Sequence, residues 1–316
     1  MRLGRRNLLN LLNLSNLLLP LLGLLFFLAF WQLASMKIRV AFGSLPGPGA
    51  VYHEASNLWQ EHLREREKAT AFYARQQGMR QEFLQANPGQ TWKERRYSGK
   101  PTYIDQIFTS LLTVFTGFLL ASLVAVPIGI LCGSSRPIHS ALKPLIEVFK
   151  PVSPLAWLPI VMILVSALYN APDPYFEKSF LSSAITVSLC SLWPTLINTA
   201  VGVASIPSDY LNVARVLKLG FLKRTIRIII PYALPYIFTG LRLSLGVGWM
   251  VLIAAEMLAQ NPGLGKFVWD MFQNGSSSTL AQIMVAVLTI GVIGVMLDRV
   301  MTSLQKLVSY DRVPVS

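Results

Sequence analysis

Small polar side chains lie beside prolines in two apolar runs of the chain. Pro151, Pro154 and Pro159 interrupt the first run, and each proline removes one helical hydrogen bond. Such a span must bend or unwind, and free carbonyls at membrane depth are tolerated only beside protein or a water-filled cavity. We therefore expect a gate here, where hydroxyl and amide groups donate to a small oxyanion and tryptophans narrow the passage. The expected pathway residues are Ser153, Trp157, Trp193, Thr195, Asn198 and Thr199. The alternative is that these polar side chains only bond neighbouring helices to one another.

Four ionisable residues lie within two other apolar runs. Arg242 and Glu256 share one run, and Asp298 and Arg299 share the other. Ionisable groups inside a membrane are expensive and usually face a bundle interior or a pathway. The separation of 256 − 242 = 14 residues spans about 21 Å along a helix, so Arg242 and Glu256 cannot pair. We expect a structural ion pair between Arg242 and Asp298, and we place Glu256 near the outer mouth.

A charged stretch from Pro207 to Pro235 separates two long apolar runs. Apolar residues recur within it at helical spacing, which predicts a helix over 210–219. Five basic residues lie in or just after this helix: Arg215, Lys218, Lys223, Arg224 and Arg227. Because cytoplasmic loops of membrane proteins carry an excess of Lys and Arg, we expect the stretch on the cytoplasmic side. A short helix that is basic on one face and apolar on another suits a cleft in a partner protein.

The composition is that of an integral membrane protein. Hydrophobic residues make up 53% of the 316 residues and charged residues only 14%, which leaves too much apolar surface for a water-soluble domain. The net charge of +13 is read first as a signal of topology and not of nucleic-acid binding. Cys132 and Cys190 lie in apolar runs without CxxC spacing, so we expect neither a disulfide framework nor a metal site. No Gly-rich loop ends in Gly-Lys-Ser/Thr, so we expect no ATP site, no cofactor and no catalysis in this chain.

Six stretches are long enough to cross a hydrocarbon core of about 30 Å as helices. They lie near 14–35, 104–132, 142–168, 180–205, 232–257 and 280–305. The basic start at Arg2, Arg5 and Arg6 indicates a retained anchor whose N-terminus is cytoplasmic. Alternating the spans from there places the C-terminus inside as well. The expected fold is an all-α membrane protein with three parts, namely a start and first span at 1–35, an extracytoplasmic insertion at 36–103 and a core at 104–316 with a cytoplasmic loop at 206–231.

The insertion contains a second amphipathic pattern. Residues 52–86 are predicted to be helical, with a broken apolar stripe and a stop at Asn87-Pro88-Gly89. One interpretation is a helix that lies on the membrane or packs on the spans. The other is a docking surface for an external partner.

Several blocks resemble known transporters. Counted from Asn212, the cytoplasmic loop resembles the coupling loop of importer-type ABC permeases, whose pattern is Glu-Ala-Ala, three residues, Gly, nine residues, Ile, any residue, Leu-Pro. Ala214, Ile228 and Pro231 are in register with this pattern, whereas Asn212, Lys218 and Ile230 replace its Glu, Gly and Leu. The blocks 45–48, 151–159, 191–199 and 254–258 resemble permeases of nitrate-type ABC importers, within the group that also takes up bicarbonate, cyanate, taurine and alkanesulfonates.

The resemblance implies a type I ABC importer permease in a bacterial inner membrane, forming a pathway for a small anion, with nitrate as the expected substrate. It implies a homodimer with a second copy, two cytoplasmic ATPase subunits that bind ATP and Mg, and an extracytoplasmic substrate-binding protein. Bicarbonate, cyanate and sulfonate or taurine remain as alternative substrates, and a passive anion channel or a membrane scaffold remains as the alternative class. The residues expected to couple to the ATPase are Asp209, Asn212, Ala214, Arg215, Leu217, Lys218 and Leu219. Lys218, at the glycine position of the pattern, predicts a helix that continues where relatives turn.

Overall fold

A computed structural model describes residues 3–40, 43–87, 91–169 and 176–308, and almost all regular structure in them is helical. The chain divides into two compact units. The first consists of Met1–Gly99 and Asp270–Val287, and the second of Lys100–Trp269 and Leu288–Ser316.

The first unit begins with the long helix α1 (Leu3–Lys37). A two-stranded antiparallel ribbon follows, formed by β1 (Arg39–Val40) and β2 (Gly43–Ser44). The indole nitrogen of Trp31 donates to the carbonyl of Pro46 at 3.0 Å, which ties the end of α1 to the segment after the ribbon. A proline in the first turn then starts α2 (Pro48–Ala86), where a missing N–H is not needed.

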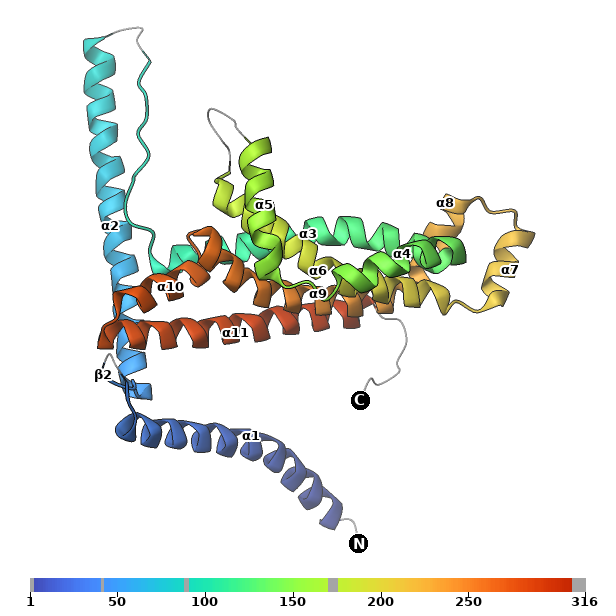
Figure 1. Cartoon of the computed structure of the whole chain (residues 1–316). Coiled ribbons are helices and arrows are strands. Elements are labelled where there is room, and N and C mark those ends of the chain that lie inside the picture. Colours follow the sequence, from blue (N-terminus) through green and yellow to red (C-terminus); the bar gives the residue numbers. More distant parts are fainter. Residues whose placement is uncertain (1–2, 41–42, 88–90, 170–175, 309–316) are drawn as a thin grey trace. The chain divides into compact units, whose positions relative to one another are not determined.

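The insertion is built from α2 and the return segment, which we define as residues 91–99. The return segment runs back along α2 in Figure 1. Aromatic side chains join the two, since Trp92 lies against Phe83 with ring centroids 5.3 Å apart and Tyr97 lies against Phe72 at 5.5 Å. The Tyr97 hydroxyl donates to Glu65 at 2.9 Å, and this hydrogen bond raises the pKa of the Tyr97 phenol. The predicted helix over 52–86 is therefore observed within α2, with a partner segment that the sequence did not indicate.

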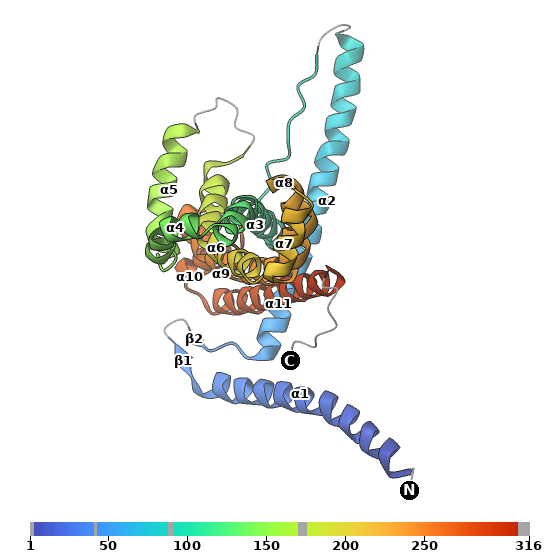
Figure 2. The same ribbon diagram turned by 90° about the vertical axis from the view of Figure 1, so that its right-hand side faces the viewer.

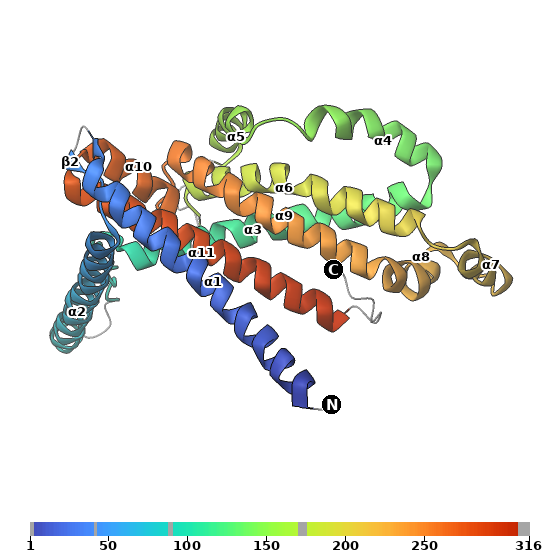
Figure 3. The ribbon, with the colours of Figure 1, turned by 90° about the horizontal axis from the view of Figure 1, so that it is seen from below.

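Three helices form the centre of the second unit: α3 (Tyr103–Ser134), α6 (Lys178–Ala204) and α9 (Ile230–Ala259). They lie side by side in Figure 3 and are seen nearly end-on in Figure 2. A capping box at Thr102 and Asp105 begins α3. The small residues Gly117, Ala121, Ala125, Gly129 and Gly133 then recur at every fourth position of α3. A Cβ at Gly129 would meet Thr199 at 2.6 Å and one at Gly117 would meet Ala184 at 2.6 Å, so this stripe lets α3 and α6 approach closely.

The predicted span 142–168 is not one helix. It forms the end of α4 (Arg136–Phe149) and all of α5 (Pro154–Leu168), and the two helices meet at a bend of 101°. Pro151 and Pro154 explain the break, because neither nitrogen can continue the helical hydrogen bonds. The bend that the prolines predict is therefore present, and the stretch 142–168 is divided between two helices.

Two helices complete the chain: α10 (Leu264–Asn274) and α11 (Ser277–Val308). Among the described residues, five helices are long and apolar enough to cross a membrane: Leu18–Lys37, Tyr103–Ser134, Lys178–Ala204, Phe221–Ala259 and Ser278–Val308. The count becomes six if the bent pair of α4 and α5 is one span. This agrees with the expected all-α membrane fold of about six spans.

Candidate functional site

The charged segment between α6 and α9 forms three short elements at one end of the second unit (Figure 3). They are α7 (Ser208–Val216), α8 (Phe221–Arg224) and the π-helix η1 (Thr225–Ile229), which runs directly into α9. A buried apolar cluster, which includes Ile206 and Ile229, lies where this segment joins α6 and α9, and Leu211 packs against it. The elements are therefore anchored to the three central helices.

The helix predicted over 210–219 ends earlier, at Val216. Lys218 has a positive φ of 49°, and its N–H donates to the Arg215 carbonyl at 2.9 Å. The N–H of Leu219 donates to the Ala214 carbonyl at 3.0 Å. These two bonds form a Schellman motif, in which the left-handed residue is usually glycine. The expectation that Lys218 continues the helix is thus wrong, because Lys218 itself makes the turn.

The exposed face of α7 also differs from the expected one. Ala214 is only 1% exposed and packs within its own chain, so the structure corrects its expected position in a partner's cleft. Val213, Val216 and Leu217 are exposed instead, and Val216 reaches 81% exposure. Residues three apart share a face of a helix, which would put Ala214 and Leu217 on the same side. Leu217 lies after the last residue of α7, so the two do not share a face.

The other expected coupling residues lie around this apolar face. Asp209 in the first turn of α7, Asn212 and Arg215 are all exposed, and the Arg215 guanidinium donates to the Asn212 side chain at 3.1 Å. Leu219 is half-buried after the turn. The segment therefore offers a small apolar surface rimmed by polar and basic groups.

Packing between helices accounts for two of the six expected pathway residues, Thr195 and Thr199, whereas Asn198 and Ser153 form hydrogen bonds within their own helices. Thr195 is fully buried, and its hydroxyl lies 2.7 Å from that of Ser244 on α9. Thr199 is fully buried where α6 meets Gly129 of α3. Asn198 donates to the Pro194 carbonyl at 2.8 Å, and the exposed Ser153 accepts from the Leu155 N–H as the N-cap of α5.

The two tryptophans occupy different places. Trp157 lies against Phe149 with ring centroids 5.7 Å apart, so it bridges the bend between α5 and α4. Trp193 is half-buried on α6. The described structure of a single chain therefore supports a packing role for the threonines, while a pathway role for the tryptophans, Ser153 and Asn198 stays a prediction.

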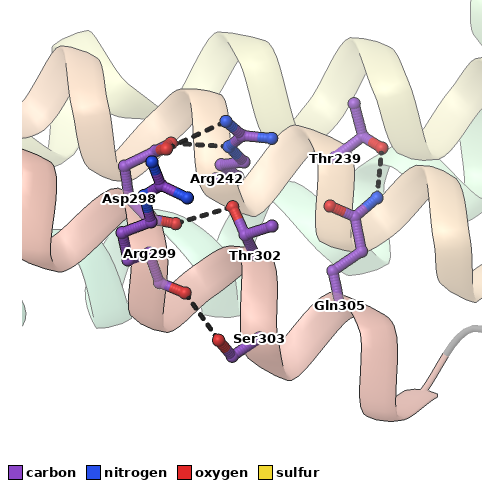
Figure 4. Close-up of polar contacts among 7 residues, drawn as sticks. All are labelled: Thr239, Arg242, Asp298, Arg299, Thr302, Ser303 and Gln305. Atoms are coloured by element: carbon purple, nitrogen blue, oxygen red, sulfur yellow. Dashed lines mark hydrogen bonds and ion pairs between the residues drawn. The ribbon is translucent and has the colours of Figure 1, made fainter. Parts of the chain in front are cut away.

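Arg242 and Asp298 lie opposite each other on α9 and α11 (Figure 4). Two nitrogens of the Arg242 guanidinium donate to the two Asp298 oxygens, at 2.5 and 2.9 Å. Nearby, Gln305 donates to the Thr239 hydroxyl at 3.0 Å. These contacts link the two helices through side chains, and the Arg299 carbonyl accepts a hydrogen bond from the Ser303 hydroxyl on the same helix (Figure 4).

Glu256 is completely buried near the end of α9. The Ser110 hydroxyl of α3 lies 2.9 and 2.8 Å from its two oxygens, and the Gly265 N–H of α10 donates to it at 2.9 Å. A Cβ at Gly263 would overlap the carboxyl group. Glu256 thus fastens the start of α10 to α3 and α9, a role that its distance from Arg242 in the sequence did not reveal. The two glycines after Asn261-Pro262 were the only local signal.

A cavity of about 500 Å³ lies between α4 and the ends of α3 and α6, beside the start of the α7 segment. Three basic side chains of α4 and Lys150 at its C-terminal end contribute to its lining, namely Arg136, His139, Lys143 and Lys150, and the lining residue Glu147 lies 3.8 Å from Lys143. The four basic residues recur at intervals of three, four and seven residues, which places them on one side of the helix. The sequence analysis did not predict this basic face. The apolar residues Leu145 and Val148 are exposed on α4 instead. The polar face of α4 therefore borders the cavity while its side chains remain exposed.

Comparison with known proteins decides the family. Residues 125–310 match the family described as binding-protein-dependent transport system inner membrane component. The chain belongs to this family. The permease is 41% identical over 203 residues to the nitrate import permease protein of Synechocystis sp., covering 64% of this chain and 69% of that one. It is 38% identical over 202 residues to a bicarbonate transport system permease protein of Synechococcus elongatus, covering 64% of this chain and 68% of the relative.

A solved structure supports the same fold. The permease resembles a chain of the MetNI methionine ABC transporter, solved in inward-facing conformations, with a TM-score of 0.55. The sequences are 12% identical, and the match covers 66% of this chain and 96% of the other. The fold is therefore that of an ABC importer permease, and the protein is a multi-pass inner membrane component. The insertion at 36–103 lies outside the matched range 125–310.

Proposed function

We propose that the permease forms the pathway of an ATP-driven importer for nitrate. The observation that carries this proposal is the 41% identity over 203 residues to a nitrate import permease. A bicarbonate permease of Synechocystis sp. is equally similar, at 41% over 205 residues, so sequence identity alone supports the class of small trigonal oxyanions. The lining of the cavity beside α4 carries more basic than acidic side chains, with Glu147 beside Lys143, and this excess supports an anion as the cargo because cationic groups attract anions.

The proposed complex contains two copies of the permease, two cytoplasmic ATPase subunits and an extracytoplasmic binding protein. ATP and Mg bind to the ATPase subunits, and this chain acts as a permease and not as an enzyme. We place α7 in the ATPase cleft through its exposed residues Val213, Val216 and Leu217. An apolar helix face that fits a groove transmits closure of the partner as a rigid-body movement.

The topology completes the proposal. Basic residues are concentrated in the α7 segment, so we place this segment, both termini and the cavity beside α4 on the cytoplasmic side. Residues 36–103 then form an extracytoplasmic insertion. The long insertion carries basic residues too, but long loops are translocated largely regardless of charge.

The test is uptake into vesicles that contain the permease with its ATPase and binding protein. We expect ATP-dependent accumulation of ¹⁵N-nitrate that exceeds that of ¹⁴C-bicarbonate at least tenfold. Preferential accumulation of bicarbonate would reassign the substrate within the group. Anion flux that is equal with and without ATP would support a passive channel and overturn the proposal.

A further inference from the structure

The insertion contains a half-open cavity of about 330 Å³ between α2 and the return segment. The side chains that the argument uses are Tyr73, Gln76 and Arg80 of α2, and Trp92, Arg95 and Arg96 of the return segment. The cavity lies wholly in the first unit and outside the range that matches the permease family. The proposed transport through the central helices does not use this cavity.

Two side chains that line this cavity carry hydrogen-bond donors without acceptors among the described residues. Gln76 is 7% exposed, and its amide nitrogen has no hydrogen-bond partner among the described residues. The indole N–H of Trp92 is buried and is likewise without an acceptor in the described part of the chain. A buried donor that loses water without gaining an acceptor costs about 1–3 kcal/mol, so two in one cavity indicate a missing acceptor.

The charges around the cavity indicate what the acceptor is. Arg80 donates to Glu94 at 2.9 Å, which uses the one acidic side chain of the lining. Arg95 and Arg96 have no acidic partner within the described ranges. Three arginines against one glutamate leave an excess of positive charge beside the two unpaired N–H groups. Such a set of donors matches an anion with several acceptor oxygens.

Contacts within the insertion position the lining of the cavity. Trp92 lies against Phe83, and the hydroxyl of Tyr73 accepts the Tyr97 N–H at 3.2 Å. Gln76 lies on α2, between Tyr73 and Arg80 in the sequence, and helical periodicity brings these positions toward one side. The donors are therefore positioned by a long helix and an aromatic contact.

We propose that this cavity is an oxyanion-binding site. Gln76 and Trp92 donate hydrogen bonds to the oxygens of a small free oxyanion, and Arg95 and Arg96 neutralise its charge. The site lies in the first unit and outside the matched range 125–310, and it retains this role whichever anion the central helices carry.

The test is isothermal titration of the purified full chain in nanodiscs with sodium nitrate and with sodium sulfate, at ionic strength held constant with sodium chloride. We expect saturable binding of at least one of these oxyanions. Gln76→Glu places a carboxylate where the amide donates and should weaken this binding at least tenfold. Arg96→Gln should weaken it similarly, whereas Arg75→Gln, on the same helix but outside the lining, should leave it unchanged.

Two results would overturn the site. One is the absence of saturable binding of either oxyanion to the wild-type chain, including the case in which only an acidic peptide binds. The other is unchanged binding in Arg96→Gln, which alters an exposed residue and decides the matter even if Gln76→Glu does not fold. Neither result bears on nitrate uptake, which is measured separately in the complete complex.

Discussion

Lys218 has a backbone conformation that glycine adopts more easily than lysine. A non-glycine residue in the left-handed region costs about 1 kcal/mol, and Lys218 has a φ of 49°. The glycine in the family pattern at this position therefore has a physical reason, which is the turn after α7. Helix propensity did not indicate this turn at Lys218, because propensity scales describe the interiors of helices and not their ends.

Lys218→Gly should stabilise the turn after α7. We expect a local gain of about 1 kcal/mol, which corresponds to about fivefold slower hydrogen exchange at the amides of Leu217 and Leu219. The matched control is Lys223→Gly inside α8, where glycine should speed exchange. Faster exchange in Lys218→Gly would contradict the assigned turn.

Glu256→Ala should destabilise the permease strongly. The change removes the acceptor of the Gly265 N–H and the partner of Ser110 and leaves a cavity, so we expect a loss of about 3 kcal/mol. Glu256→Gln should lose less, because its amide oxygen still accepts a hydrogen bond. Thermal unfolding in detergent measures both, with the exposed Glu147→Ala as the control. If Glu256→Ala and the wild type unfold at the same temperature, Glu256 does not hold the start of α10 against α3.

At the scale of elements, the stripe of small residues on α3 sets the distance to α6. Gly129→Ala should cost about 1–3 kcal/mol, because the new Cβ would lie 2.6 Å from the Thr199 Cβ and 2.8 Å from the Leu196 carbonyl oxygen. Gly246→Ala on α9 meets nothing within 4 Å and should be neutral or slightly stabilising. Samples of both variants are heated and then run on a size-exclusion column. The two are compared by the temperature at which half of the protein still elutes as a monodisperse peak. A drop for Gly246→Ala that matches the drop for Gly129→Ala would argue against close packing.

The spans were predictable from sequence because their signal is the length of an apolar run, which needs no tertiary knowledge. The presence of a bend between α4 and α5 was predictable, because prolines break a helix, but its angle was not. The orientation of α7 was not predictable. Ala214 and Val216 are both apolar residues in one short helix, and only tertiary packing, in which α7 contacts η1, decides that Ala214 is buried. The same holds for Glu256, whose partners Ser110 and Gly265 come from two other helices.

At the scale of the whole molecule, the proposed topology places the return segment and the α7 segment on opposite sides of the membrane. In a variant without Cys132 and Cys190, Ser98→Cys should react with an impermeant maleimide in intact cells. Lys223→Cys should react only after permeabilisation. Both positions are exposed, so access and not burial determines labelling. The reverse pattern would invert the topology.

We propose that α7 couples this permease to an ATPase through its exposed apolar face. Val216 is 81% exposed at the end of α7, so Val216→Glu leaves the permease fold intact but places a charge in the proposed contact. The decisive measurement is ATP-driven nitrate uptake in vesicles that contain the complete complex, with Val216→Ala as the control. We predict that Val216→Glu loses at least tenfold in uptake while the permease is inserted normally. Full uptake by Val216→Glu would contradict coupling through α7.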